Sequence, residues 1–247
     1  MTMPDPSKPS SRRLVSSLRQ MAASSANGAV FCGNVHYRNE VLFARGLYPP
    51  IEVPPGITPR QPFFASMADM IGLATQRRRK YEYNVDLSDS LSHFPAGYTH
   101  SDLAVRFLDF DRQWQRAGSS WRYQGGRICL DVTIGVYADE RSRERPRCLS
   151  LILQHELLHV ADEVEIAMEY LPWTAAQAPF IRSHFQVPIP DREFEARVRG
   201  SGGGEGSEFE RLIQRSLWIP ESSRRASQAH SDNPDDGRVI ANCLKGG

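Results

Sequence analysis

The chain has 247 residues, 40% of them hydrophobic, and its 30 Lys and Arg balance 29 Asp and Glu to a net charge of +1. This composition suits one domain with its own core, and it gives no overall basic field that would attract nucleic acid. No apolar run approaches the roughly 18 residues that a membrane span needs. We therefore expect a soluble protein with no membrane span and no nucleic-acid partner.

The N-terminal residues 1–28 are rich in Ser, Pro and Ala, which predicts a flexible arm. Arg12 and Arg13 are similar to the start of a twin-arginine export signal, but residues 16–20 are too polar for the apolar segment of such a signal. We interpret the pair as a solvated basic arm. Without a convincing signal peptide, the chain is expected in the cytoplasm or delivered by a secretion system.

Between residues 28 and 64, pairs of prolines forbid regular helix, so we expect extended chain with a short strand around 41–43. Apolar residues at helical spacing predict a helix over 63–75, which the basic residues 77–80 end. Alternating apolar residues predict a strand over 80–87.

Two longer patterns follow. The residues Leu103, Phe107, Phe110 and Trp114 form a stripe at helical spacing and predict a helix over 101–116. Apolar residues alternate strictly over 127–138, which predicts a long strand. A charged loop then leads to Pro146, a residue suited to the first turn of a helix.

The segment from Pro146 to about Tyr170, ahead of Pro172, is apolar most of the way round and predicts a central buried helix. It contains the pattern H-E-x-x-H at His155, Glu156 and His159. Positions four apart share one helix face, so both imidazoles can aim at one point.

A Zn²⁺ ion at that point would take two histidine nitrogens and leave room for a third protein ligand and a water. Glu156 could reach that water and remove its proton, as in zinc peptidases. Chance matches to so short a pattern are common. However, burying two histidines and a glutamate without partners costs several kcal/mol, which a metal would offset. We therefore predict a Zn²⁺ site with His155 and His159 as ligands and Glu156 as the catalytic base.

Downstream, Asp191 is expected to cap a helix over 192–198, and the glycine-rich residues 200–206 to break it. A last amphipathic helix is predicted over 207–218, and a loose polar tail over 220–247. The chain thus divides into an N-terminal arm (1–28), one domain (29–219) and the tail.

A third ligand is needed. The metzincin pattern would place Gly at 162 and His at 165, where Asp162 and Glu165 stand. Glu193, 34 residues after His159, lies in Glu-Phe-Glu-Ala, which resembles the glutamate-ligand motif E-[FY]-x-A-D of gluzincin metallopeptidases, although Arg197 replaces its Asp. The resemblance covers about residues 127–199. It implies that Glu193 is the third metal ligand, with Glu195 and Asp162 as alternatives.

The resemblance also implies an α+β, zincin-like fold: a twisted sheet, edged by the 127–138 strand, packed on the central helix with further helices. The implied function is a zinc endopeptidase whose protein or peptide substrate pairs with a sheet edge, serving protein turnover or acting as a secreted effector or toxin. His184, Tyr170 and Arg192 are candidate stabilisers of the transition state. The alternative is a non-catalytic binding or structural module that zinc stabilises.

The four cysteines, Cys32, Cys129, Cys148 and Cys243, form no C-x-x-C pair, so a cysteine zinc site is not expected. Two disulfides in three possible connectivities remain open. Without a signal peptide we expect mostly free thiols.

Overall fold

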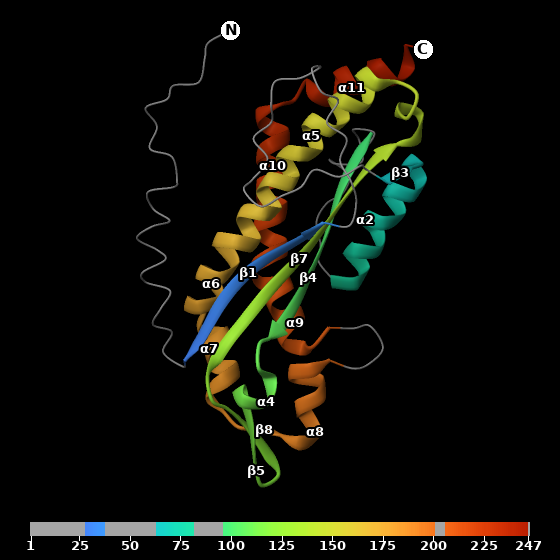
Figure 1. The fold of residues 1–247 in the computed structure, drawn as a ribbon. Helices are drawn as coiled ribbons and strands as arrows, with labels where there is room; N and C mark the ends of the chain where they lie inside the picture. Colours follow the sequence, from blue (N-terminus) through green and yellow to red (C-terminus); the bar gives the residue numbers. More distant parts are fainter. Residues whose placement is uncertain (1–27, 38–62, 82–95, 201–205, 247) are drawn as a thin grey trace, which may run out of the picture.

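The computed structural model describes residues 28–37, 63–81, 96–200 and 206–246. The expected N-terminal arm and the strand around 41–43 lie outside these residues. Of the strand expected over 80–87, residues 80–81 are helical, at the end of the helix over 67–81, and the rest lies outside the described residues. The described elements are β1 (Ala29–Tyr37), β3 (Phe63–Ala65), α2 (Met67–Tyr81), β4 (Gly97–Phe107), α4 (Phe110–Gln113), β5 (Trp114–Ala117), β6 (Ser120–Tyr123), β7 (Gly126–Asp139), α5 (Pro146–Glu165), α6 (Leu171–Gln177), α7 (Pro179–Gln186), β8 (Ile189–Pro190), α8 (Asp191–Phe194), α9 (Glu208–Ile213), α10 (Ile219–Asp232) and α11 (Asp236–Lys245). They form a mixed body of helices and strands, consistent with the expected α+β class at this coarse level (Figure 1).

The strand β7 is the centre of the larger sheet and runs through much of the length of the molecule (Figure 1). β1 pairs parallel with its first part and β3 with its last three residues, while β4 pairs antiparallel with it. The alternating apolar side chains of β7 are fully buried: Ile128, Leu130, Val132, Ile134 and Val136. The strand is therefore confirmed, but its expected place at a sheet edge is wrong, because strands pair with it on both sides.

The helix predicted over 101–116 is also wrong. This stretch contains most of β4, the short helix α4 and the start of the β5–β6 hairpin. Ser101 and Leu103 are buried at alternate positions of β4, and Val105 and Phe107 pack against the core at the next two. Asp109 then adopts a left-handed conformation with φ 61°, which turns the chain into α4.

The predicted central helix is confirmed as α5, with Pro146 in its first turn. It does not stop before Pro172. A π-helical turn (Ile166–Tyr170) follows directly, and Pro172 lies in the first turn of α6, where a missing N–H costs nothing. The turn packs tightly on β1, because a Cβ atom at Gly33 would lie within 1.8 Å of the carbonyl oxygen of Ala167. Only glycine allows this approach.

Two disulfides join segments far apart in sequence. Cys32 and Cys129 are register partners on the neighbouring strands β1 and β7, and their sulfurs are bonded. Cys148 in the first turn of α5 is bonded to Cys243 on α11. No cysteine is free, so the expectation of free thiols is wrong.

The C-terminal tail, expected to be loose, forms the helices α10 and α11. The predicted helix over 207–218 is confirmed as α9 with a π-helical turn (Gln214–Trp218), and α10 continues from it without a break. α10 and α11 both lie along α5 (Figure 1). We call them the C-terminal arm. The tail looked loose because few apolar residues mark it: Ile240 and Leu244 are its buried ones.

The opposite end of the molecule is built from aromatic rings. The smaller sheet β5–β6–β8 leads into α8, and the aromatic end that we define there comprises Phe107, Phe110, Trp114, Trp121, Tyr123, Phe185, Phe194 and Phe209, whose rings contact one another. Asp191 begins α8 and is ion-paired with Arg116 at 2.5 Å; it does not cap the helix.

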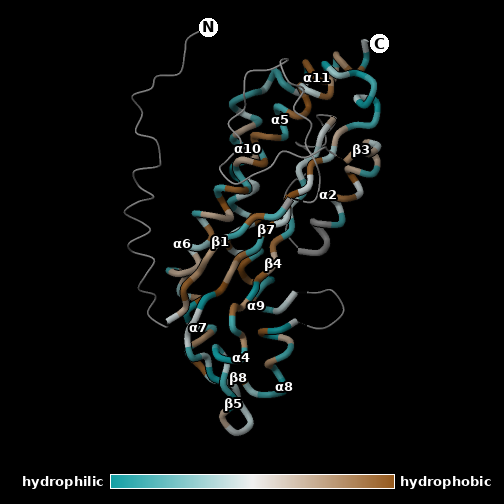
Figure 2. The backbone as a smooth tube through the Cα atoms, viewed as in Figure 1, coloured by the Kyte–Doolittle hydropathy of each residue, from teal (hydrophilic) through white to brown (hydrophobic). Residues whose placement is uncertain are grey.

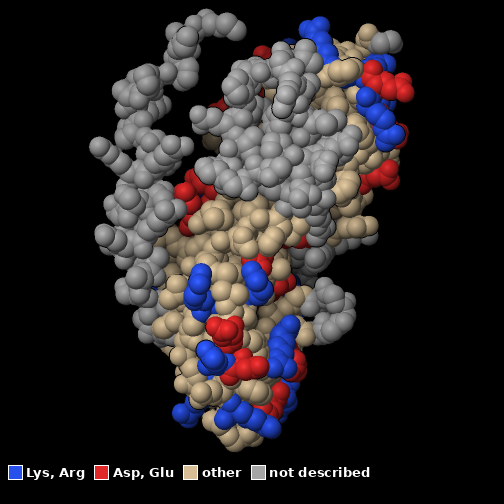
Figure 3. Space-filling model, in the orientation of Figure 1, with Lys and Arg blue, Asp and Glu red and all other residues tan. Residues whose placement is uncertain are grey.

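The colouring by hydropathy follows this organisation. Hydrophobic residues recur along β1 and β7 (Figure 2). On the face shown in Figure 3, basic and acidic side chains lie interleaved over the aromatic end. Across the residues that the structure describes, no helix combines the length and the apolar character that a membrane crossing requires.

Candidate metal centre

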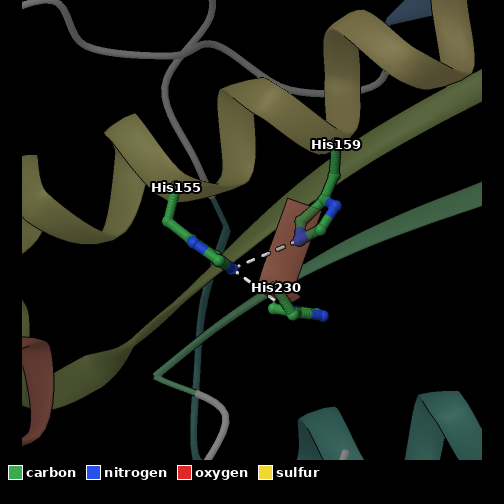
Figure 4. Close-up of side chains that lie close together, drawn as sticks. All are labelled: His155, His159 and His230. Atoms are coloured by element: carbon green, nitrogen blue, oxygen red, sulfur yellow. Dashed lines mark hydrogen bonds between the residues drawn. The ribbon is translucent and has the colours of Figure 1, made fainter. Parts of the chain in front are cut away.

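Two of the predicted ligands meet as the helical spacing requires. His155 and His159 lie one turn apart on α5, and their Nε2 atoms are 3.2 Å apart (Figure 4). The side chain of His155 is only 12% exposed. The two imidazoles thus present their ring nitrogens to one point beside the helix.

The third residue at this point is His230, on α10 of the C-terminal arm. Its Nε2 lies 3.2 Å from Nε2 of His155 (Figure 4), and one ligand atom of each histidine lies within 4.8 Å of the others. We call His155, His159 and His230 the histidine cluster. The sequence prediction missed His230.

A network of polar contacts fixes α10 against α5. The buried carboxylate of Glu163 accepts hydrogen bonds from Trp218 Nε1 at 2.9 Å and from the hydroxyl of Ser222. Arg225 is ion-paired with Glu165 at 3.0 Å and, within α10, with Glu221 at 2.8 Å. The first two turns of α10 are therefore held against α5, and the helix continues to His230, whose side chain lies opposite the two histidines of α5.

The geometry of the cluster fits a tetrahedral ion. Ligands about 2.0–2.1 Å from a tetrahedral Zn²⁺ lie about 3.3–3.4 Å from one another. The two measured Nε2 separations, each 3.2 Å, are close to this value. His155 Nε2 also faces two other ring nitrogens at once, and one proton on it could serve only one of them. A cation shared by three lone pairs satisfies all three nitrogens, so the residues present fit a zinc ion.

The protonation state of His159 suits this role. Burial, together with the neighbouring charges of His155 and His230, lowers the pKa of His159 to about 3. The imidazole is therefore neutral at physiological pH, which is the form that binds a metal.

Glu156 lies on the adjacent side of α5, turned toward the sheet. Its Oε2 accepts a hydrogen bond from Thr99 Oγ1 at 2.7 Å, and the same hydroxyl lies 3.2 Å from its backbone carbonyl. A Cβ atom at Gly97 would lie 2.5 Å from Glu156 Oε1, so β4 carries a glycine where the carboxylate packs. Burial raises the pKa of Glu156, while the charge of His155 and the bond from Thr99 lower it. The carboxylate is thus buried, oriented and electrostatically coupled to the cluster.

Glu193 does not join the cluster, so its expected position beside the histidines is not found. Its neighbour Phe194 is buried and stacks on Trp121 with ring centroids 4.4 Å apart. This contact holds α8 at the aromatic end, away from the middle of α5 (Figure 1). The carboxylate of Glu193 instead lies 3.5 Å from Arg197, the residue that departs from the gluzincin motif.

The alternative ligands are also engaged elsewhere. Glu195 is ion-paired with Arg199 at 3.3 Å, and Asp162 lies 3.8 Å from Arg225. Burial raises the pKa of Asp162. Neither residue belongs to the group of side chains that could share an ion.

Of the candidate transition-state stabilisers, His184 is buried against the rings of Phe185 and Phe209 at the aromatic end. Arg192 is exposed beside Glu193. Tyr170 packs against the hydrophobic core. None of the three belongs to the histidine cluster.

Sequence signals for His230 were weak. Five histidines lie outside the H-E-x-x-H pattern, at positions 36, 93, 100, 184 and 230, and no spacing rule separates them. The usable signal was the helix: Pro220 suits a first turn, and Glu221 and Arg225 stand four apart, as in a helix stabilised by ion pairs.

Comparison of the chain with protein-family models, with curated proteins and with solved structures gives no significant match. The function must therefore be inferred from the geometry of the site.

Proposed function

We propose that the chain is a zinc-dependent endopeptidase in which His155, His159 and His230 bind the ion and Glu156 is the general base. The observation that carries the proposal is the convergence of three histidines beside a buried glutamate, with Nε2 of His155 at 3.2 Å, close to tetrahedral spacing, from Nε2 of both His159 and His230. The order H-E-x-x-H on one helix gives each residue the position that this chemistry needs.

The number of ligands favours an enzyme over a structural zinc module. A structural zinc site is closed by four protein ligands, whereas a catalytic site keeps one position for water or substrate. Within the described residues, the group that could hold an ion has three members. This count leaves a coordination position for the reacting water.

The chemistry follows from the residues. Zinc bound in such a site supplies a water of lowered pKa and a Lewis acid for the scissile carbonyl. Glu156 takes the proton of the attacking water and then delivers it to the leaving amine. Thr99 holds the carboxylate through both transfers. Because all three ligands are neutral imidazoles, they leave the double charge of the ion undiminished, whereas a glutamate ligand would have cancelled half of it.

The test compares two identical substitutions. Glu156→Gln keeps the shape of the side chain but removes the base, whereas Glu208→Gln alters an exposed carboxylate in the first turn of α9. We expect wild type and both variants to fold and to contain about one zinc per chain. Cleavage of an unfolded protein or a peptide library should fall about 10²–10⁴-fold in Glu156→Gln and stay near wild type in Glu208→Gln.

Two outcomes would contradict the proposal. Full cleavage by Glu156→Gln would show that the activity belongs to another site. Zinc-loaded wild type that cleaves nothing in the library would instead favour the zinc-stabilised binding module. Metal content is measured by elemental analysis of protein prepared without chelators, and chelation should abolish cleavage.

A further inference from the structure

The C-terminal arm brings a second polar residue to the histidine cluster. Asp236, in the first turn of α11, places its Oδ2 3.5 Å from Nδ1 of His155. This is the ring nitrogen that does not face the cluster, since Nε2 of His155 faces His159 and His230. His155 is thus contacted from both sides by residues of the C-terminal arm.

The position of Asp236 is fixed from two directions. On one side, a turn joins α10 to α11, with the backbone N–H of Asp236 donating to the carbonyl of Asn233 at 3.3 Å. On the other side, the Cys148–Cys243 disulfide and a 2.6 Å hydrogen bond from Arg145 to the carbonyl of Leu244 tie the end of α11 to the start of α5. Both ends of α11 are therefore anchored, which keeps the backbone of Asp236 beside His155.

We propose that Asp236 is a positioning residue for the metal centre: its carboxylate accepts the Nδ1–H of His155 and so turns the Nε2 lone pair of that ring toward the ion. A histidine with Nδ1 protonated keeps Nε2 unprotonated, which is the state a ligand requires. The carboxylate also makes the imidazole a stronger donor to the metal. The inference rests on the proposed zinc site and adds the reason why His155 stands in the correct tautomer.

The chain offers a matched control in the preceding residue. Asp235 carries the same charge and lies beside the same helix start, but its side chain is 77% exposed and lies 3.7 Å from Arg238. Removing Asp235 thus costs α11 the same favourable charge near its N-terminus without touching His155. A difference between the two positions reports on the contact with the histidine.

The experiment measures Zn²⁺ affinity of the full chain, with both disulfides intact, by competition with a chromophoric chelator. Asp236→Ala should weaken binding about 10–100-fold, the range found when a residue that supports a metal ligand is removed. Asp235→Ala should stay within about twofold of wild type. Asp236→Asn, which keeps an oxygen acceptor but not the charge, should fall between Asp236→Ala and wild type.

A second measurement separates positioning from a loss of fold. Co²⁺ bound in place of Zn²⁺ has visible absorption bands that depend on ligand geometry, and these bands should shift in Asp236→Ala but not in Asp235→Ala. Equal Zn²⁺ affinity and equal Co²⁺ spectra for the two alanine variants would overturn the proposal. Wild type that binds neither metal would refute the proposed zinc site itself, which is a distinguishable result.

Discussion

A glutamate lies on a helix in each of two regions, Glu156 beside the histidine cluster and Glu193 at the aromatic end, but the surroundings of the two side chains differ. Glu156 is buried, accepts a hydrogen bond from Thr99 and is next to His155. Glu193 is 40% exposed and lies beside two arginines. Both residues belong to short motifs known from zinc peptidases, but only the first lies among groups that can bind a metal.

The difference shows that a motif places a residue on a helix, whereas packing places the helix in the molecule. At the aromatic end, the burial of Phe194 against Trp121 and Trp114 decides where α8 lies, and Glu193 follows. At the cluster, Glu163 and Trp218 decide where α10 lies, and His230 follows. In each case, buried contacts along the same helical segment determine whether a polar side chain lies at the histidine cluster.

The largest expected effect on Zn²⁺ affinity tests directly whether the histidine cluster, and not Glu193, binds the metal. His230→Ala removes one of the three proposed ligands and should weaken Zn²⁺ binding by more than roughly 100-fold, beyond the loss seen for residues that only support a ligand. Glu193→Ala should leave Zn²⁺ affinity within about twofold of wild type, because its carboxylate pairs with arginines. The measurement is a chelator competition at fixed pH and salt.

The reverse ranking of those two variants would restore the gluzincin-like ligand set that the sequence motif implied. It would require α8 to lie next to α5. Equal, small effects of both variants would leave His155 and His159 as a two-ligand site.

The elements that could be predicted from sequence are those in which one long stretch of sequence forms a single strand or helix. The strand β7 alternates over its whole length, and α5 opens with Pro146 and stays apolar round its circumference. The helix predicted over 101–116 was wrong because the residues of this stretch that face the core come from three elements. Leu103 and Phe107 belong to a strand, Phe110 to a short helix and Trp114 to the next strand, and together they imitate a helical stripe.

Only those residues of the candidate site that are close together in the sequence could be predicted. His155, Glu156 and His159 lie within five consecutive residues, little more than one turn of one helix, so their spacing alone defines their geometry. His230 reaches them through tertiary contacts that no spacing encodes, across 71 residues from His159. The disulfides belong to the same class, since Cys32 and Cys129 are neighbours only because β1 and β7 pair in that register.

A substitution at the aromatic end should change the stability of the protein without changing its Zn²⁺ affinity. Phe194→Ala should lower the free energy of unfolding by about 3–5 kcal/mol, because it opens a cavity among packed rings. Zn²⁺ affinity of the folded protein should not change, since the histidine cluster is held by α5 and α10. Val187→Ala, at a side chain 68% exposed, is the control and should change stability by less than about 0.5 kcal/mol. Urea unfolding measures stability; a concomitant loss of Zn²⁺ affinity in folded Phe194→Ala would show that the two regions are coupled.

The last expected effect appears only when the pH is lowered, and it concerns the buried histidine of the aromatic end. Burial lowers the pKa of His184 to about 4, and the charge of Arg197 lowers it in the same direction. The unfolded chain binds this proton at the ordinary value near 6.5, so the folded state is most stable above that pH and loses stability as pH falls toward 4. A shift of this size corresponds to about 3 kcal/mol. His184→Leu removes the titrating group and keeps the packing against Phe209. The change in the free energy of unfolding of the metal-free protein between pH 7 and 4 should therefore shrink by about 3 kcal/mol. His159 keeps its own contribution in that variant, which makes the difference between the two proteins specific to the aromatic end. An unchanged slope in urea titrations at several pH values would mean that His184 is protonated as readily in the folded chain as in the unfolded one.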